Sequence, residues 1–207
     1  MTKKLILAPH IDDDVLGCGG IMDKNTHVVY CGMDEQHLPE RPAAAVRLQE
    51  AAAAAEYAGH QYSILNNQVN YYKVQSLIQA FESSILQLKP DHIYLPQPSY
   101  NQDHRVVYEA AITALRPHDK NFFVKKAFVY EQPHTFLWAQ RPGRIDVFEP
   151  NYFVPIDIDH KVKLYNLMGS QVRSFRSPEI LRSMAHLRGH QCNSAYAEAY
   201  GILRWVE

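Results

Sequence analysis

One histidine and three aspartates stand together in a short stretch near the N-terminus. The apolar residues 5–9 are followed at once by His10 and, one residue later, by Asp12, Asp13 and Asp14. Three adjacent carboxylates repel one another, and a divalent cation relieves that repulsion. An imidazole beside a carboxylate suits zinc, and it also suits iron or another transition metal. The stretch therefore indicates a metal site.

Two other interpretations of this stretch stay open. Aspartate is a common cap residue, so an acidic turn that begins a helix is the first. Gly17, Gly19 and Gly20 follow closely, so a dinucleotide-binding loop is the second. These glycines lack the GxGxxG spacing, and the acids precede them where a pyrophosphate would have to approach. A dinucleotide-dependent oxidoreductase is therefore disfavoured.

A second polar cluster contains Asn101, Asp103 and His104 and leads into a helical pattern. It follows an apolar run and a short turn, so His104 is expected near a helix start, just past the carboxyl end of a strand. In a parallel sheet such ends share one edge, so His104 can reach His10 and Asp13. Two nitrogens and one oxygen leave a fourth position open for water, as catalytic zinc sites require.

The elements that must position these clusters alternate along the chain. Apolar runs predict strands at residues 5–9, 28–31, 62–65, 92–95, 125–131 and 152–158. Helical patterns occupy residues 43–58, 73–88, 105–115 and 159–172, with Asp159 as the expected cap of the last helix. Alternation of this kind favours βαβ units around a buried parallel sheet. Residues 132–150 contain proline and glycine and predict a long loop or hairpin that shapes a binding surface.

Composition limits the class of protein. The 207 residues, 46% of them hydrophobic, suit one soluble globular domain over residues 1–207. The net charge of −1 and the lack of a basic stripe argue against nucleic acid as a partner. Every apolar run is shorter than the roughly 20 residues of a membrane span, and the first is too short for a signal peptide. Three scattered cysteines predict a reducing, cytoplasmic location.

Both clusters resemble the signatures of the LmbE-like (PIG-L) N-deacetylase family. Residues 10–14 and 17–20 are similar to the family's His-Pro-Asp-Asp-Glu sequence and its Gly-Cys-Gly-Gly turn. Residues 101–104 are similar to its His-x-Asp-His sequence. Weaker similarity, to an Arg-x-x-Glu helix and to the C-terminal segments of the family, covers residues 47–50, 163–171 and 196–200, so the resemblance runs in order along nearly the whole chain.

The resemblance implies a Rossmann-like three-layer α/β sandwich with a mostly parallel sheet. It also implies a zinc-dependent hydrolase, with Fe²⁺ as an alternative metal, that removes an N-acetyl group from a glucosamine-type sugar or sugar conjugate. By the same resemblance His10, Asp13 and His104 bind the metal, and Asp12 is the general base that activates water. GxSxG and HExxH motifs are absent, so a serine hydrolase and a zincin are excluded.

The sequence departs from the family pattern at three positions. Ile11 replaces a proline, which should change only local rigidity, and Asp14 replaces a glutamate. Asp14 and Asp103 are both expected to lie behind the metal ligands and to support them. Asn101 replaces a histidine that is expected to stabilise the oxyanion or to protonate the leaving amine. An asparagine can donate a hydrogen bond there, but it cannot carry a proton.

Two further residues are candidates for the site. His134 follows the predicted strand 125–131 and is a candidate for the missing proton donor; the alternative is an ordinary surface histidine. Asp12 could itself return the proton that it accepts. Arg47 is a candidate for contact with a substrate hydroxyl or phosphate, as its family position implies. The alternative is a helix pair with Glu50, three residues further on.

Rival functions stay open at this stage. Asn101 favours a non-hydrolytic member that only binds sugar or metal, whereas the intact set of metal ligands and base argues against it. An amidase that acts on another acyl group or on a thiol conjugate would keep the same metal chemistry. The expected partner is a small N-acetylated sugar or conjugate, and the aromatic-rich second half is compatible with an oligomer.

Overall fold

A mixed sheet forms the centre of the computed structural model, which describes residues 2–35, 42–117, 120–136 and 148–207. Its seven strands lie in the order β3-β2-β1-β4-β5-β7-β6. Their bounds are β1 Lys4–Ala8, β2 Thr26–Asp34, β3 Gln61–Gln68, β4 His92–Pro96, β5 Lys126–Tyr130, β6 Tyr152–Pro155 and β7 Ala197–Trp205. The neighbours from β3 to β5 pair in parallel, and only β7 runs antiparallel to the strands on either side of it.

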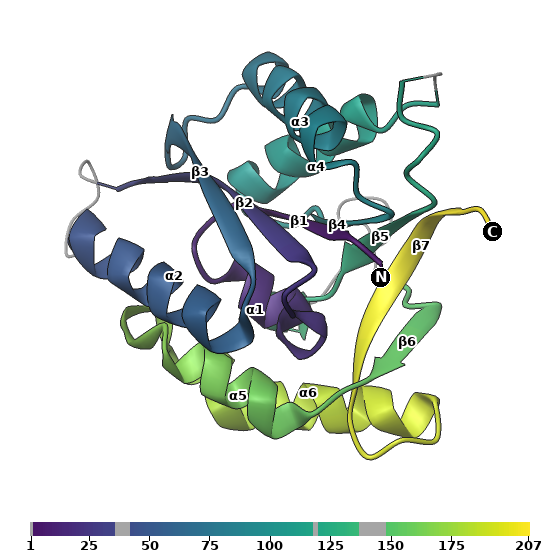
Figure 1. The fold of residues 1–207 in the computed structure, drawn as a ribbon. Coiled ribbons are helices and arrows are strands. Elements are labelled where there is room, and N and C mark those ends of the chain that lie inside the picture. Colours follow the sequence, from purple (N-terminus) through teal and green to yellow (C-terminus); the bar gives the residue numbers. More distant parts are fainter. Residues whose placement is uncertain (1, 36–41, 118–119, 137–147) are drawn as a thin grey trace.

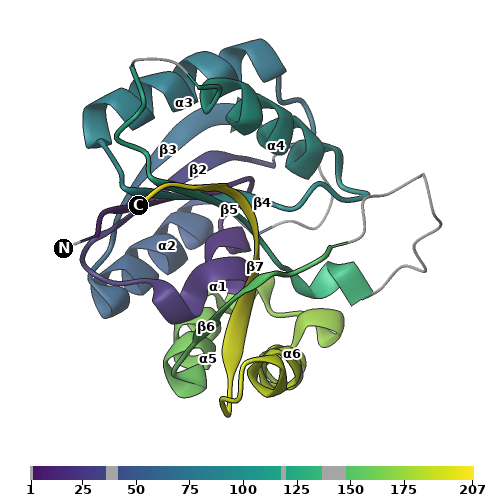
Figure 2. The same cartoon turned by 90° about the vertical axis from the view of Figure 1, so that its right-hand side faces the viewer.

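Helices cover both faces of this sheet. Helices α1, α2, α5 and α6 lie on one face, and α3 and α4 lie on the other (Figures 1 and 2). The helix bounds are α1 Asp13–Cys18, α2 Ala44–Ala58, α3 Val74–Leu88, α4 Gln102–Ala114, α5 Ile158–Asn166 and α6 Pro178–Gln191. The predicted three-layer α/β sandwich with a mostly parallel sheet is confirmed. None of the helices in the described ranges is both long enough and apolar enough to cross a membrane.

The apolar sequence of β1 follows from this layering. Alternate side chains of a strand point to opposite faces of a sheet. Leu5 and Leu7 accordingly pack into the core under α3 and α4, while Ile6 and Ala8 pack into the core under α1, α2 and α5. Because both faces are buried, the strand reads as a continuous apolar run rather than as an alternating one.

The C-terminal half differs from its prediction. The strand expected at residues 152–158 ends at Pro155, and the helix expected at 159–172 begins at Ile158 and ends at Asn166. Asp157, not Asp159, caps this helix, because its side chain accepts hydrogen bonds from the backbone of residues 159 and 160. Helix α6 and strand β7 were not predicted, and α1 was foreseen only in the alternative interpretation of the acidic stretch as a helix start. Of the expected loop 132–150, residues 137–147 lie outside the described residues.

Two glycines explain the Gly-Cys-Gly-Gly turn as a packing requirement. A Cβ on Gly17 would lie 2.2 Å from the ring of Tyr130, and a Cβ on Gly20 would lie 2.5 Å from the side chain of Ile156. The Tyr130 ring cannot easily move aside, since its hydroxyl donates to the Leu7 carbonyl at 3.0 Å. These contacts let α1 lie directly against β5, and let the turn after α1 lie against Ile156, the residue that follows β6.

A buried ion pair fastens the same turn to the C-terminal half. Lys161 Nζ lies 2.6 Å from Glu198 Oε1 and donates to the Leu16 carbonyl at 2.9 Å. Glu198 also accepts a hydrogen bond from the backbone of Gly20 at 2.8 Å and one from the hydroxyl of Tyr200 at 2.6 Å. Each charge is therefore both paired and hydrogen-bonded, as a buried charge must be.

The variant Lys161→Met leaves Glu198 buried without its cation. We expect the free energy of unfolding in urea to fall by about 3–5 kcal/mol, the range found when one partner of a buried pair is removed. The double variant Lys161→Met/Glu198→Gln removes both charges and should recover part of that loss. A single variant as stable as the wild-type protein would show that the pair does not hold the turn.

Candidate active site

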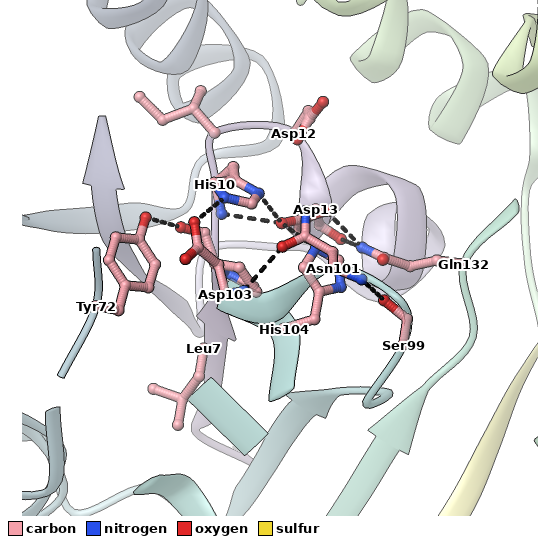
Figure 3. A network of polar contacts seen from close by, with 12 residues as sticks. Leu7, His10, Asp12, Asp13, Tyr72, Ser99, Asn101, Asp103, His104 and Gln132 are labelled. Carbon is pink, nitrogen blue, oxygen red and sulfur yellow. Dashed lines mark hydrogen bonds and ion pairs between the residues drawn. The ribbon is translucent and has the colours of Figure 1, made fainter. Parts of the chain in front are cut away.

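Three side chains converge just beyond the carboxyl ends of β1 and β4. His10 follows β1, Asp13 is the first residue of α1, and His104 lies in the first turn of α4. Asp13 Oδ2 lies 3.2 Å from His10 Nδ1 and 3.3 Å from His104 Nε2. One possible ligand atom from each residue lies within 4.8 Å of the others, and Figure 3 shows the three side chains facing one another. The structure thus brings together the predicted metal ligands from distant parts of the sequence.

Two further side chains hold these ligands from outside. Asp103 Oδ2 lies 2.9 Å from His10 Nε2 and accepts a hydrogen bond from the backbone of Asn70 at 2.8 Å. Because the Asp103 carboxylate accepts from Nε2, a neutral His10 ring, as metal binding requires, would present the lone pair of Nδ1 on the side of Asp13. Gln132 donates to the other oxygen of Asp13, Oδ1, at 2.7 Å. Asp103 therefore contacts His10, a predicted ligand, and its supporting role stays a prediction, whereas the contact of Gln132 was not predicted.

The electrostatics of the cluster call for a positive charge. Burial lowers the pKa of His10, but hydrogen bonds to the Asp103 and Asp13 carboxylates outweigh it and raise that pKa to about 10. Burial raises the pKa of Asp13, but His104 and His10 hold it well below its usual range. The carboxylates thus stabilise a cation at this point. A divalent ion held by two nitrogens and one oxygen meets the same demand, so the donor set fits a metal.

Asp12 points away from this cluster (Figure 3) and lies in the wall of the same cavity. Its φ of 143° is rare for a residue other than glycine and costs on the order of 1–3 kcal/mol. The acidic stretch does begin a helix, with Asp12 at the N-cap position of α1, but the Asp12 side chain makes no capping bond. The carboxylate instead lies 2.8 Å from Arg176 Nη1. Burial raises the pKa of Asp12, and the positive charge of Arg176 opposes that rise.

Arg47 is buried and holds the backbone between His10 and Asp13 in place. Its Nη2 donates to the Ile11 carbonyl at 2.7 Å, and its Nη1 lies 2.8 Å from Glu35 Oε2. The alternative pairing with Glu50 is wrong, because Glu50 accepts hydrogen bonds from the backbone and hydroxyl of Ser170, both at 2.6 Å. Arg47 lines the cavity, so its contact with a substrate stays a prediction.

The remaining predicted residues take different places. Asn101 caps α4, accepting a hydrogen bond at Oδ1 from the backbone of Asp103 at 2.8 Å, and its side-chain NH₂ is left as the donor. His134 lies in the cavity wall with its ring centroid 5.3 Å from that of His104, not on the open surface. Burial and the nearby His104 lower the pKa of His134 to about 3. Asp14 is fully buried and accepts a hydrogen bond from the Tyr30 hydroxyl at 2.8 Å.

The cavity around these groups has a volume of about 370 Å³, enough for a sugar-sized ligand. Arg173 and Arg176 enter it from the segment that precedes α6, and neither residue was predicted. Tyr100 and Phe175, each nearly half exposed, lie among its lining residues. Among the sequence signals, only the position of Gln132 directly after a predicted strand could have pointed to one of these missed residues.

Solved structures share this fold over nearly the whole chain. A conserved protein from Thermus thermophilus has a TM-score of 0.77 at 22% identity, and the match covers 100% of this chain and 97% of the Thermus chain. The 4-carboxy-2-hydroxymuconate hydratase GalB from Pseudomonas putida has a TM-score of 0.76 at 20% identity, over 100% and 99%. The N,N'-diacetylchitobiose deacetylase from Pyrococcus horikoshii has a TM-score of 0.73 at 22% identity, over 98% and 84%. A comparison with curated proteins gave no match.

The fold and the site define a Rossmann-like α/β protein with a His-Asp-His cluster at the carboxyl edge of its sheet. The family model described as PIG-L, GlcNAc-PI de-N-acetylase, matches residues 5–115, which include both polar clusters. The chain belongs to the PIG-L family.

The variant Asp103→Asn tests the support of His10. An amide can present its NH₂ group to Nε2 and no longer fixes the imidazole, so we expect the affinity for Zn²⁺ to fall about 10–100-fold. Equilibrium dialysis against ZnCl₂ measures it. Asp159→Asn, which changes an exposed carboxylate on α5, is the control and should keep the wild-type affinity. If both variants bind Zn²⁺ with the wild-type affinity, Asp103 does not support the metal site.

Proposed function

We propose that the protein is a metal-dependent N-deacetylase that hydrolyses the acetamide of a glucosamine-type sugar or sugar conjugate. The observation that carries this proposal is the separation of roles in one cavity. His10, Asp13 and His104 face a common point, while the Asp12 carboxylate stays out of that cluster and lies in the same wall. A site built only to bind a metal has no need of this fourth group. Membership of the PIG-L family supports the acetamide as the bond that is cleaved.

A divalent ion in this site supplies Lewis acidity, which polarises a carbonyl and acidifies water. We propose Zn²⁺, with Fe²⁺ as the alternative, since imidazole and carboxylate ligands suit both. Asp12 takes the proton of the attacking water at its carboxylate, and Arg176 keeps that carboxylate ionised and oriented. The protonated Asp12 carboxyl gives this proton to the nitrogen as the C–N bond breaks, which yields acetate and a free amino group.

Asn101 and His134 are the candidates for binding the acetamide oxygen. Asn101 retains its NH₂ group as a donor after capping α4, and His134 Nε2 is buried without a hydrogen-bond partner among the described residues. A well-placed donor to a developing oxyanion contributes roughly 3–4 kcal/mol in other enzymes.

We further propose a cytoplasmic location, since Cys18, Cys31 and Cys192 are all free of disulfide bonds.

Metal content and acetate release test this proposal together. We expect about one metal ion per chain and acetate release from at least one member of a panel of N-acetylglucosamine derivatives. Asp12→Asn should keep the metal and lower kcat by about 10²–10⁴-fold, the usual contribution of a general base. His104→Ala should lose both the metal of the cavity site and the activity. Asp159→Asn serves as the control for a general loss of charge.

The same measurement separates the rival functions. A member of the fold that hydrates a double bond, as the structurally similar hydratase does, would hold the metal and release no acetate. A purely binding protein would hold it and convert nothing. An Asp12→Asn variant as active as the wild-type protein would contradict the role of Asp12.

The variant Arg176→Gln tests the partner of the base through pH dependence. Because Arg176 lowers the pKa of Asp12, its removal raises that pKa, and a higher pH is then needed to ionise the base. We expect the acidic limb of the pH profile of kcat/KM to move to higher pH by about one to three units. Arg173→Gln is the matched control, since Arg173 bonds to the backbone of residues 170 and 172, and its limb should stay in place. A shift of equal size in both variants would argue against a specific pair.

A further inference from the structure

Two exposed histidines lie outside the cavity on consecutive turns of α6. His186 and His190 are four residues apart, so their side chains share one face of the helix. Their Nε2 atoms are 3.2 Å apart, and their ring centroids are 4.6 Å apart with the planes inclined at 76°. The two nitrogens therefore face each other directly rather than stacking ring on ring.

The protonation of His186 is fixed by its other nitrogen. His186 Nδ1 lies 3.2 Å from the Ala195 carbonyl oxygen, which can only accept a hydrogen bond. Nδ1 therefore carries the hydrogen, and in the neutral ring Nε2 presents a lone pair. Without a cation, His190 Nε2–H donates to that lone pair. A carbonyl that fixes the tautomer in this way is a usual companion of a metal-binding histidine.

A glycine between the two histidines makes this carbonyl contact possible. A Cβ on Gly189 would lie 2.6 Å from the Ser194 carbonyl oxygen and 2.8 Å from that of Ala195. The backbone of Ser194 donates to the Gly189 carbonyl at 2.9 Å, so the segment that leads to β7 is docked on the helix. The ring of Tyr196, 5.8 Å from that of His186, completes the support. His186 is thus held by the fold, unlike an isolated surface side chain.

The spacing of the pair matches a chelate. Two nitrogens bound tetrahedrally to zinc at 2.0–2.1 Å lie about 3.3 Å apart, and the observed separation is 3.2 Å. His190 lies in the last turn of α6, where the helix dipole favours a cation. The neighbouring cation is engaged elsewhere, because Arg188 Nε donates to Glu131 at 2.8 Å and its Nη1 to Gln191 at 2.7 Å.

We propose that His186 and His190 form a second, surface site for a divalent transition-metal ion such as Zn²⁺, separate from the site in the cavity. The two Nε2 atoms fill two coordination positions, and water fills the others. On binding, the proton on His190 Nε2 passes through water to Nδ1 of the same ring, so both imidazoles stay neutral. The ion links two turns of α6 and stabilises the folded chain by mass action.

Zinc binding at pH 7.5 to the protein already loaded with one equivalent of metal tests this site. We expect isothermal titration with ZnCl₂ to detect a further equivalent in the wild-type protein, and added Zn²⁺ to raise its Tm. His190→Ala should lose this equivalent and the rise in Tm. The substitution keeps the contact between His186 and Ala195, and alanine favours a helix, so circular dichroism should confirm the fold.

His160→Ala is the matched control, since His160 lies on α5 and stacks on Tyr57 instead of facing another histidine. It should bind the further equivalent as the wild-type protein does. His104→Ala separates the two sites, because it should lose the cavity metal and keep the surface one. A further equivalent that persists in His190→Ala, or that never occurs in the wild-type protein, would overturn the proposal.

Discussion

Asp12, Asp13 and Asp103 are all buried at the carboxyl edge of the sheet, where water cannot solvate their charges. Each finds a positively charged or protonated partner from another element. Asp12 pairs with Arg176, Asp13 faces both His10 and His104, and Asp103 faces His10. This need for compensation joins the N-terminal cluster to α4 and to the segment before α6. The site is therefore also the point at which three distant parts of the chain are held together.

The short helix α1 is held at both ends by contacts with other parts of the chain. Its N-terminus holds Asp12 in a strained conformation, and Arg47 fixes the preceding carbonyl of Ile11. Its C-terminal end is held by the Lys161–Glu198 pair. With both ends of α1 fixed, the Asp13 carboxylate can face His10 and His104 while the neighbouring Asp12 carboxylate faces the cavity. The backbone strain at Asp12 is the cost of placing two adjacent carboxylates in different roles.

Much of the fold and the centre of the site could be predicted because their signals are local. The polar cluster comes directly after a buried strand, and parallel pairing brings the second cluster to the same edge. Arg176 has no such signal, since its position depends on how the C-terminal half folds back. That half contains β7, which lies antiparallel between β5 and β6. The sequence of β7 shows no simple hydrophobic periodicity that would predict this strand. The cap at Asp157 was missed for a similar reason: the buried Ile158 must lie inside the helix, which places the cap before it.

Anomalous diffraction at the zinc edge, from crystals grown with Zn²⁺, is the most direct test of the proposal that His10, Asp13 and His104 bind a metal while Asp12 stays free of it. We expect a peak within ligand distance of His10 Nδ1, Asp13 and His104 Nε2, with Asp12 outside the coordination sphere and Asp103 on the far nitrogen of His10. A peak ligated by Asp12, or no peak between the two clusters, would contradict it. With no peak there, Asp13 and Asp103 would have to be compensated by protons on the neighbouring histidines alone.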